Sequence, residues 1–172
     1  SETAQALEKA RSAYATRAPE AEATLRALLG VDEAKDEAAF RLAHLCAESG
    51  RAAEARTLAT TVSGRSAFSD RIEALERLLE LVEAAGDEGA AAAAVAATPG
   101  DPDARWALAA AHAKAGRLGP AMEELLESVS RKPRHADGRA RKALLAIFDH
   151  LDEPGRDAEL AREYRRRLQI VS

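Results

Sequence analysis

The side chains of this sequence that could hold a metal ion or perform catalysis are few and widely spaced. The four histidines are His44, His112, His135 and His150, and none forms a His-x-x-x-His pair or lies at metal-ligand spacing from the single cysteine, Cys46. No serine lies in a nucleophile elbow, and no glycine loop of the phosphate-binding kind is present. These residues predict no catalytic, cofactor or metal site, so an enzyme is not expected.

The elements that position these side chains are predicted to be helical hairpins, because one pattern occurs twice. Residues 36–62 and 102–128 each continue through a helix-like stretch to Ala-x-x-Gly-Arg, after which a second helix begins. The two copies lie 66 positions apart. This offset is about twice the 33 or 34 residues of a tetratricopeptide repeat, a hairpin that buries its apolar face against neighbouring hairpins. The pattern resembles a tetratricopeptide protein, whose surface serves partners.

Prolines and glycines divide the chain into about ten helices and predict an all-α fold. Asp101 followed by Pro102 is a helix start signal, and Asp137 is expected to cap the ninth helix. The alanine-rich run 90–97 is expected to be a close-packed helix. We predict one tetratricopeptide-like domain over residues 1–172, with clearest repeats at 36–62 and 102–133. It is an α-α superhelix (solenoid) of five hairpins at residues 2–29, 34–62, 67–97, 102–131 and 135–170.

Two of the rare aromatic side chains occupy the same place in the two clear repeats. These are Phe40 and Trp106, and His44 lies one helical turn after Phe40 on the same predicted face. If exposed, the three side chains would form an aromatic-lined groove for unstructured or helical apolar segments of a partner. The alternative is that Phe40 and Trp106 pack against the adjoining hairpin, and the sequence leaves both open.

The last predicted hairpin, residues 135–170, holds the most distinctive residues. It begins with Asp-Gly-x-x-Arg-Lys at 137–142 and ends near a segment that contains Tyr164, Arg165, Arg166 and Leu168. Three successive arginines cover about 300 degrees of a helix, so at least one of them should face solvent. Helix stabilisation and partner binding are both compatible with this segment.

These two motifs, after hairpin repeats, resemble the C-terminal region of the bacterial thioredoxin-like co-chaperones, or chaperedoxins, of the YbbN/CnoX family. The resemblance implies a preceding thioredoxin-fold domain, and binding of unfolding clients that are passed to a chaperonin or a DnaK-type chaperone. It also implies that Tyr164, Arg165, Arg166 and Leu168 contact the chaperonin. The 172 residues contain no Trp-Cys-x-x-Cys motif. The chain would therefore be an excised C-terminal half or a free-standing relative.

Charge and hydropathy narrow the remaining classes of partner. The net charge is -4, although residues 131–172 hold eleven Lys or Arg against seven Asp or Glu. The negative net charge argues against a dedicated nucleic-acid binder. A contact between the arginine-rich C-terminal end and nucleic acid is nevertheless one alternative to the co-chaperone, ranked third. No apolar run is long enough to cross a bilayer, and no secretory signal is recognised, which predicts a cytoplasmic protein. The alternative ranked second, directly after the co-chaperone, is a stand-alone scaffold for one dedicated protein partner.

Overall fold

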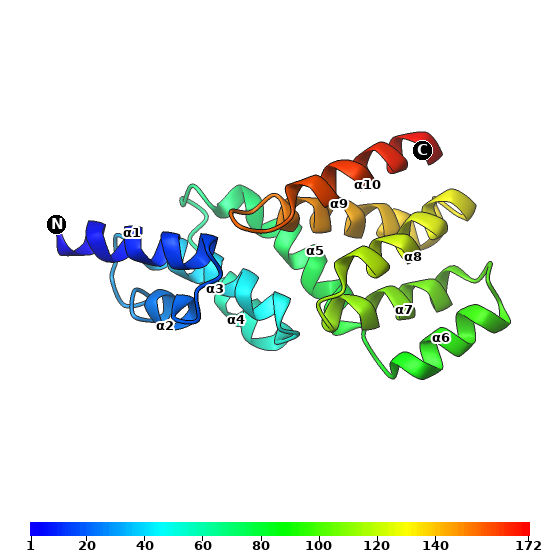
Figure 1. The fold of residues 1–172 in the computed structure, drawn as a ribbon, viewed down its shortest axis with the longest axis horizontal. Helices are drawn as coiled ribbons and strands as arrows, with labels where there is room; N and C mark the ends of the chain where they lie inside the picture. Colours follow the sequence, from blue (N-terminus) through cyan, green and yellow to red (C-terminus); the bar gives the residue numbers. More distant parts are fainter.

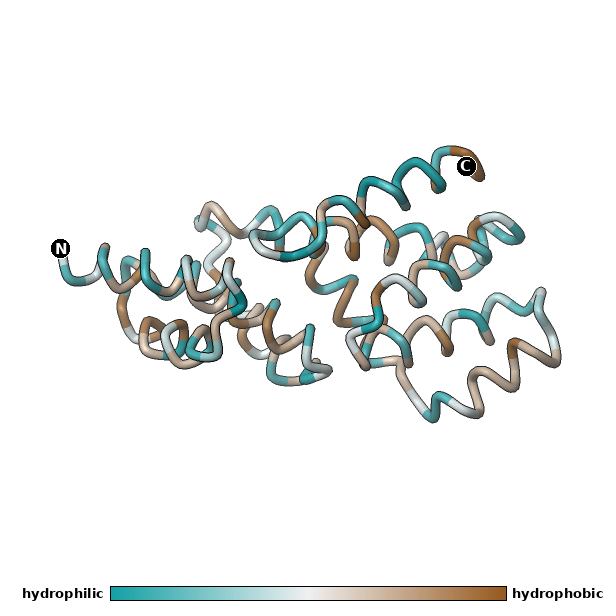
Figure 2. The backbone as a smooth tube through the Cα atoms, viewed as in Figure 1, coloured by the Kyte–Doolittle hydropathy of each residue, from teal (hydrophilic) through white to brown (hydrophobic).

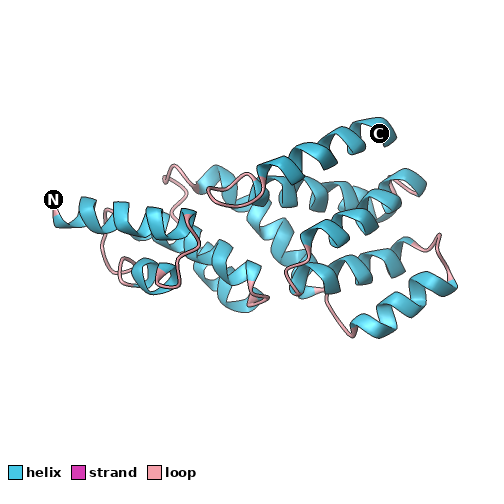
Figure 3. Cartoon of the chain, in the orientation of Figure 1, coloured by secondary structure: helices cyan, strands magenta, loops and turns pink.

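The computed structural model describes residues 1–172 and contains only helices, as the sequence predicted (Figures 1 and 3). Ten α-helices are joined by short loops, two of which contain a 3₁₀ turn. The elements are α1 (Glu2–Ala15), α2 (Ala21–Arg26), α3 (Lys35–Glu48), α4 (Ala52–Thr60), η1 (Ser69–Arg71), α5 (Ile72–Glu83), α6 (Glu88–Ala97), α7 (Pro102–Lys114), α8 (Leu118–Arg131), η2 (His135–Gly138), α9 (Arg139–Leu151) and α10 (Ala158–Val171). No helix of the chain is both long enough and apolar enough to cross a membrane.

Of the two helix starts predicted from capping residues, one is correct and one is wrong. Asp101 accepts a hydrogen bond from the backbone N–H of Asp103 at 2.9 Å, and Pro102 is the first residue of α7. The prediction for Asp137 is wrong, because this residue lies in η2 with a φ of 57° and does not cap α9. Gly138 is the residue before α9, and the Asp137 carboxylate instead binds the Lys142 ammonium at 3.1 Å.

The second and fourth hairpins form as predicted, whereas the third predicted hairpin opens. Helices α3 and α4 pack together, as do α7 and α8. Helix α6 packs on α7, but α5 packs on α4, α7 and α9 (Figure 1). Helix α5 thus packs on the first helices of the fourth and fifth hairpins, α7 and α9, and not on α6, its predicted partner.

The apolar surface of α5 explains this position. Its buried side chains, Leu75, Leu78, Leu79, Leu81 and Val82, cover a wide arc of the helix instead of one narrow stripe. A helix with so broad an apolar surface needs neighbours on several sides. Packing between α4, α7 and α9 supplies them, and all five side chains belong to the main hydrophobic core.

Helix α6 has the opposite character: the expected helix forms over the alanine run and packs on α7, but only one side of it is covered. Of its ten residues only Ala91 is buried, so most of the alanine run faces solvent. Figure 2 shows this apolar segment at the outside of the fold. High helix propensity therefore accounts for the alanines better than close helix packing does.

The two Ala-x-x-Gly-Arg turns meet where α3 and α7 end. Gly50 and Gly116 both have left-handed backbone conformations, with φ values of 76° and 80°. A Cβ atom on Gly50 would lie 2.8 Å from the backbone oxygen of Lys114, whereas the nearest atom to one on Gly116 would be the Glu48 oxygen at 3.5 Å. The close approach at Gly50 joins the N-terminal hairpins to the C-terminal ones.

Candidate functional site

The structure buries both aromatic residues that could have formed an open groove. Phe40 is fully buried and Trp106 is 9% exposed, which is the packed alternative of the two that the sequence left open. Each ring lies beneath an arginine of a following segment. The Arg71 guanidinium is 4.6 Å from the Phe40 ring centre, and that of Arg139 is 4.3 Å from the Trp106 ring.

His44 lies next to Phe40 on α3, as predicted, and contacts a histidine that the sequence did not connect with it. The two rings of Phe40 and His44 meet edge to face with centres 4.7 Å apart. The Nδ1 atom of His44 lies 2.8 Å from the Nδ1 atom of His150 on α9. These histidines are 106 positions apart, and no spacing motif relates them. Helix α5, which packs on both α3 and α9, brings these two helices together.

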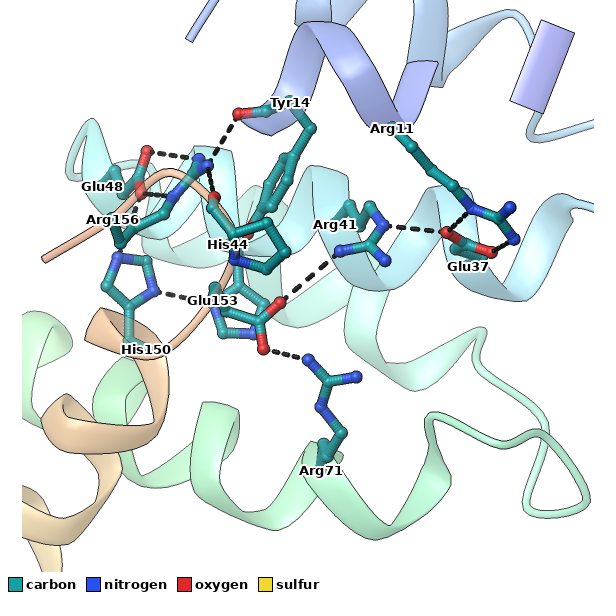
Figure 4. Close-up of polar contacts among 11 residues, drawn as sticks. Arg11, Tyr14, Glu37, Arg41, His44, Glu48, Arg71, His150, Glu153 and Arg156 are labelled. Carbon is teal, nitrogen blue, oxygen red and sulfur yellow. Dashed lines mark hydrogen bonds and ion pairs between the residues drawn. The ribbon is translucent and has the colours of Figure 1, made fainter. Parts of the chain in front are cut away.

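His150 continues into a buried ion pair between Glu48 and Arg156 (Figure 4). The Nε2 atom of His150 lies 3.1 Å from Glu48 Oε1, and Arg156 Nε donates to the same oxygen at 2.6 Å. The Arg156 side chain is fully buried, and its Nη1 donates to the backbone oxygen of Tyr14 at 2.8 Å. These contacts join α1, α3, α9 and the loop before α10.

A second branch of the same cluster runs along α3 (Figure 4). Glu37 accepts two hydrogen bonds of 2.7 Å from Arg11 and one of 2.9 Å from Arg41. Arg41 also lies 3.6 Å from Glu153, which forms an ion pair with Arg71. We call the ten labelled residues of Figure 4 the polar junction; they are Arg11, Tyr14, Glu37, Arg41, His44, Glu48, Arg71, His150, Glu153 and Arg156.

The charges of the polar junction are fixed by burial and by hydrogen bonds. Burial raises the pKa of Glu48, but hydrogen bonds from His150 and Arg156 outweigh it and lower the pKa to about 2. Burial, with nearby positive charge as a smaller cause, lowers the pKa of His44 well below its usual value. At neutral pH the Glu48 carboxylate is therefore ionised and the His44 ring is neutral.

The proton positions on the histidine pair follow from these partners when both rings are neutral. His150 then donates its Nε2–H to the Glu48 carboxylate, so its Nδ1 is an acceptor. His44 must donate its Nδ1–H to that atom, which leaves His44 Nε2 as an acceptor. This Nε2 atom is buried and has no hydrogen-bond partner within the protein.

Two cavities flank the polar junction. One of about 130 Å³ has apolar walls that include Leu78 and Val82, and it also contacts His150. The other, of about 280 Å³, is lined by Phe40 and His44 together with acidic residues of α9 and the loop that follows it. The second cavity is thus the one that His44 lines.

The C-terminal helix α10 separates the four predicted contact residues into two sets. Tyr164 and Leu168 are buried against the stack, at 6% and 4% exposure. Arg165 is partly exposed and pairs with Asp152 at 2.6 Å, whereas Arg166 faces solvent without an ion pair. The expectation that at least one arginine of this run faces solvent is confirmed.

Tyr164 is held by a carboxylate on α8. Its hydroxyl donates to Glu123 at 2.7 Å, and Arg167 binds the same carboxylate. Burial and the bond to Glu123 raise the pKa of Tyr164 to about 12. Tyr164 therefore fixes α10 to α8.

A groove between α8 and α10 contains a residue that the sequence analysis missed. Ile170 is 82% exposed and lines a groove of about 210 Å³ with Leu126 and Val171. An exposed isoleucine is one of only two large apolar side chains on the surface, the other being Leu145. Its position four residues after Arg166 is a helical spacing that could have indicated a shared face.

Cys46 and His112 contact only other parts of the protein. Cys46 is fully buried on α3, and burial raises the pKa of its thiol, which favours the unreactive protonated form. His112 lies on α7, where its Nδ1 accepts a hydrogen bond of 3.2 Å from Arg117. No group of three or more His, Cys, Asp or Glu side chains is arranged to hold a metal ion.

The stacked antiparallel helices and the surface grooves define a helical repeat protein. The family model for the tetratricopeptide repeat matches residues 84–171, just over half of the chain. The chain belongs to the tetratricopeptide repeat family. A search of curated proteins found no match. Repeats of this family generally mediate protein–protein interactions and are typically scaffolds without catalytic activity.

Proposed function

We propose that this chain is the protein-interaction domain of a thioredoxin-like co-chaperone of the cytoplasm. It would bind unfolding client proteins, a larger chaperone of the chaperonin or DnaK type, or both. The observation that carries the proposal is the exposed face of α10, which combines positive charge with an apolar side chain. The family match supports a protein partner, and the motifs of residues 137–142 and 164–168 support a partner of the chaperone class.

The exposed face of α10 has the composition of a docking surface. Arg162, Arg166 and Ile170 recur at helical spacing and all face solvent. Tyr164 and Leu168 lie on the opposite, buried side, so their role in this proposal is to hold the helix in position. A partner that presents an apolar side chain flanked by carboxylates would complement this face.

The arginines of α10 fit a protein partner better than nucleic acid. Arg165 and Arg167 already pair with Asp152 and Glu123, which leaves fewer free cations for phosphates.

Purified components test the proposal directly. We expect the chain to co-elute with a purified bacterial chaperonin or to bind a DnaK-type chaperone, and to slow aggregation of a heat-unfolded test protein. Arg166→Glu and Ile170→Glu should each weaken chaperone binding at least about tenfold, because each removes a contact from the exposed face. Lys9→Glu, a charge reversal on the exposed surface of α1, is the matched control and should change nothing.

A stand-alone scaffold for one dedicated partner is the second candidate. It is favoured by the family match, which supports a protein partner without specifying a chaperone. If the chain binds neither chaperone and does not slow aggregation, the scaffold replaces the co-chaperone. Unchanged chaperone binding by the Arg166→Glu variant would remove α10 from the interface.

A further inference from the structure

Positive charge is concentrated in the segment that connects α8 to α9. Residues 131–142 contain six Lys or Arg and one Asp, whereas the whole chain has a net charge of -4. The segment includes the last residue of α8, the 3₁₀ turn η2 and the start of α9. We call residues 131–142 the basic turn. The rest of the chain is negative overall, so the charge of the basic turn stands out from its surroundings.

The basic turn lies at one end of the helical stack (Figure 1). On one side, Arg131 reaches the loop between α6 and α7, where a Cβ atom on Gly100 would lie 3.8 Å from its Nη1. On the other side, Arg141 Nη1 donates a hydrogen bond of 2.9 Å to the hydroxyl of Ser172, the residue after α10. The basic turn is therefore flanked by both segments.

Three cations of the basic turn have no carboxylate partner. Lys132, Arg134 and Arg141 are exposed, and none of them forms an ion pair. Most arginines of this protein do form one. The three free cations are thus available to the carboxylates of another molecule.

The backbone of the basic turn has an unusual conformation. Ala136, Asp137 and Gly138 are three successive residues with positive φ, of 49°, 57° and 70°. This conformation suits glycine and is tolerated by aspartate, but it is unfavourable for alanine. Such strain persists only where the surrounding structure holds the backbone, and it is frequent in segments that bind ligands.

Ion pairs hold the basic turn in this conformation. Asp137 binds the Lys142 ammonium at 3.1 Å, which links the turn to α9. Asp103 of α7 lies 2.7 Å from His135 Nε2 and 2.9 Å from Arg139 Nη2. The free cations therefore extend from a backbone that is already fixed, and a fixed backbone lowers the entropy lost on binding.

Carboxylates of a protein complement this surface better than other anions do. A guanidinium group binds a carboxylate through two parallel N–H donors, and an ammonium adds a point charge. Nucleic acid fits less well, because the negative rest of the chain would repel its backbone and no aromatic side chain of the turn is exposed for base stacking. A membrane surface fits less well because the two large exposed apolar side chains, Leu145 and Ile170, lie outside the turn.

We propose that the basic turn binds an acidic, unstructured segment of a partner protein, with Lys132, Arg134 and Arg141 as its contact residues. The bound segment is a short run of Asp and Glu. This surface is additional to the exposed face of α10, and the proposal does not depend on the partner being a chaperone.

Two rhodamine-labelled peptides test the proposal with the full chain. One has the sequence Gly-Glu-Asp-Glu-Leu-Asp-Glu-Gly, and the other carries Gln and Asn in place of each Glu and Asp. At about 50 mM salt, where surface charges are less screened, we expect saturable binding of the acidic peptide by fluorescence anisotropy. The neutral peptide should bind at least about tenfold more weakly, because the charge-assisted hydrogen bonds are lost. Equal binding of both peptides, or of neither, would overturn the proposal.

Charge reversals locate the contact. Arg134→Glu and Arg141→Glu should each weaken the acidic peptide at least about fivefold, because each replaces an attraction by a repulsion. Arg65→Glu is the matched control, since Arg65 is also an exposed arginine without an ion pair but lies in the loop between α4 and α5. It should change binding less than about twofold. A loss in Arg65→Glu as large as in Arg134→Glu would show that the peptide responds to overall charge and would refute the site.

Two further measurements separate the alternatives. Backbone amide NMR shifts on addition of the acidic peptide should be largest in residues 131–142, and largest shifts elsewhere would refute the basic turn as the site. An oligothymidylate of the same charge, or phosphatidylserine vesicles, should bind more weakly than the acidic peptide. Tighter binding of either would identify a nucleic-acid or membrane surface and overturn the proposal.

The test is independent of the chaperone test. Arg134→Glu should retain chaperone binding, and Arg166→Glu should retain binding of the acidic peptide. Failure of one proposal therefore leaves the other standing.

Discussion

The second and fourth hairpins follow one sequence pattern, and the structure shows how far their similarity extends. In each, an aromatic residue of the first helix is buried beneath an arginine at the start of a later helix. Phe40 lies under Arg71, and Trp106 lies under Arg139. The ring in each case supplies apolar contact area and the guanidinium covers its face.

The similarity includes an ion pair at the turn of each hairpin. Arg51 binds Glu22 of the preceding helix at 2.5 Å, and Arg117 binds Glu88 of its preceding helix. Both members of the second pair lie 66 positions after those of the first. The repeat therefore extends to α2 and α6, beyond the two helices of the hairpin itself.

The difference between the hairpins lies inside the first helix. His44 and Glu48 of the second hairpin correspond to Ala110 and Lys114 of the fourth. The second hairpin thus contributes to a buried polar cluster, whereas Ala110 belongs to the apolar core. The repeat pattern therefore determines the helical scaffold of both hairpins. Different residues at two equivalent positions of the first helix produce a polar cluster at the second hairpin only.

The largest effect should come from the ion pair that is found only beside the second hairpin. Arg156→Ala should lower the free energy of unfolding by about 3 to 5 kcal/mol, because it leaves the mostly buried Glu48 carboxylate with His150 alone and removes the donor of the Tyr14 carbonyl. Urea denaturation followed by circular dichroism measures the loss. Adding Glu48→Gln should recover part of it, and a loss below about 1 kcal/mol would show that the pair is not needed for stability.

The two turn glycines offer a matched comparison of backbone contacts. Gly116→Ala should cost about 1 to 2 kcal/mol, the usual penalty of a left-handed backbone for alanine. Gly50→Ala should cost at least about 1 kcal/mol more, because its Cβ would lie 2.8 Å from the Lys114 oxygen. Denaturant midpoints of the two variants provide the measurement. Equal losses would mean that the turns do not meet as closely as described.

The histidine of the second hairpin should make stability depend on pH. The lowered pKa of buried His44 means that the unfolded chain takes up a proton first as the pH falls below 6.5, so stability decreases. From pH 7 to pH 5 the loss should be at most about 2 kcal/mol. Urea denaturation at both pH values should show the loss in the wild type and little of it in His44→Gln.

The smallest effects should come from the ion pairs that both hairpins share. Arg51→Ala and Arg117→Ala should each cost less than about 1 kcal/mol, because the paired side chains are 38% to 49% exposed. Both losses should shrink in 1 M salt, where such pairs are screened. Thermal unfolding at low and high salt would measure this. A much larger loss for one variant would contradict the equivalence of the two turns.

Much of the helical scaffold could be predicted because its determinants are local. The Asp101–Pro102 start of α7 was predicted correctly, and like the left-handed turn at Gly116 it depends on neighbouring backbone groups alone. Asp137 shows the limit of this reasoning. Its short polar side chain suits a helix cap, but the chain adopts a positive φ there and places Gly138 before the helix.

The candidate sites were less predictable, because they depend on helices that are distant in sequence. His44 was recognised on its own helix, but its partner His150 is 106 positions away, and no pattern connected them. Ile170 was overlooked because an isoleucine in an amphipathic helix normally faces the core, whereas this one is exposed.

The sequence by itself determined the all-α class, the repeat and most helix boundaries, since these follow from helix propensity, capping and apolar periodicity within short segments. Only the tertiary structure decided that α5 lies across α7 and α9, that Phe40 and Trp106 are buried, and that ten polar side chains converge at one junction. The physical reason is that side-chain burial depends on which helices become neighbours, and an apolar surface as broad as that of α5 can be buried in more than one way.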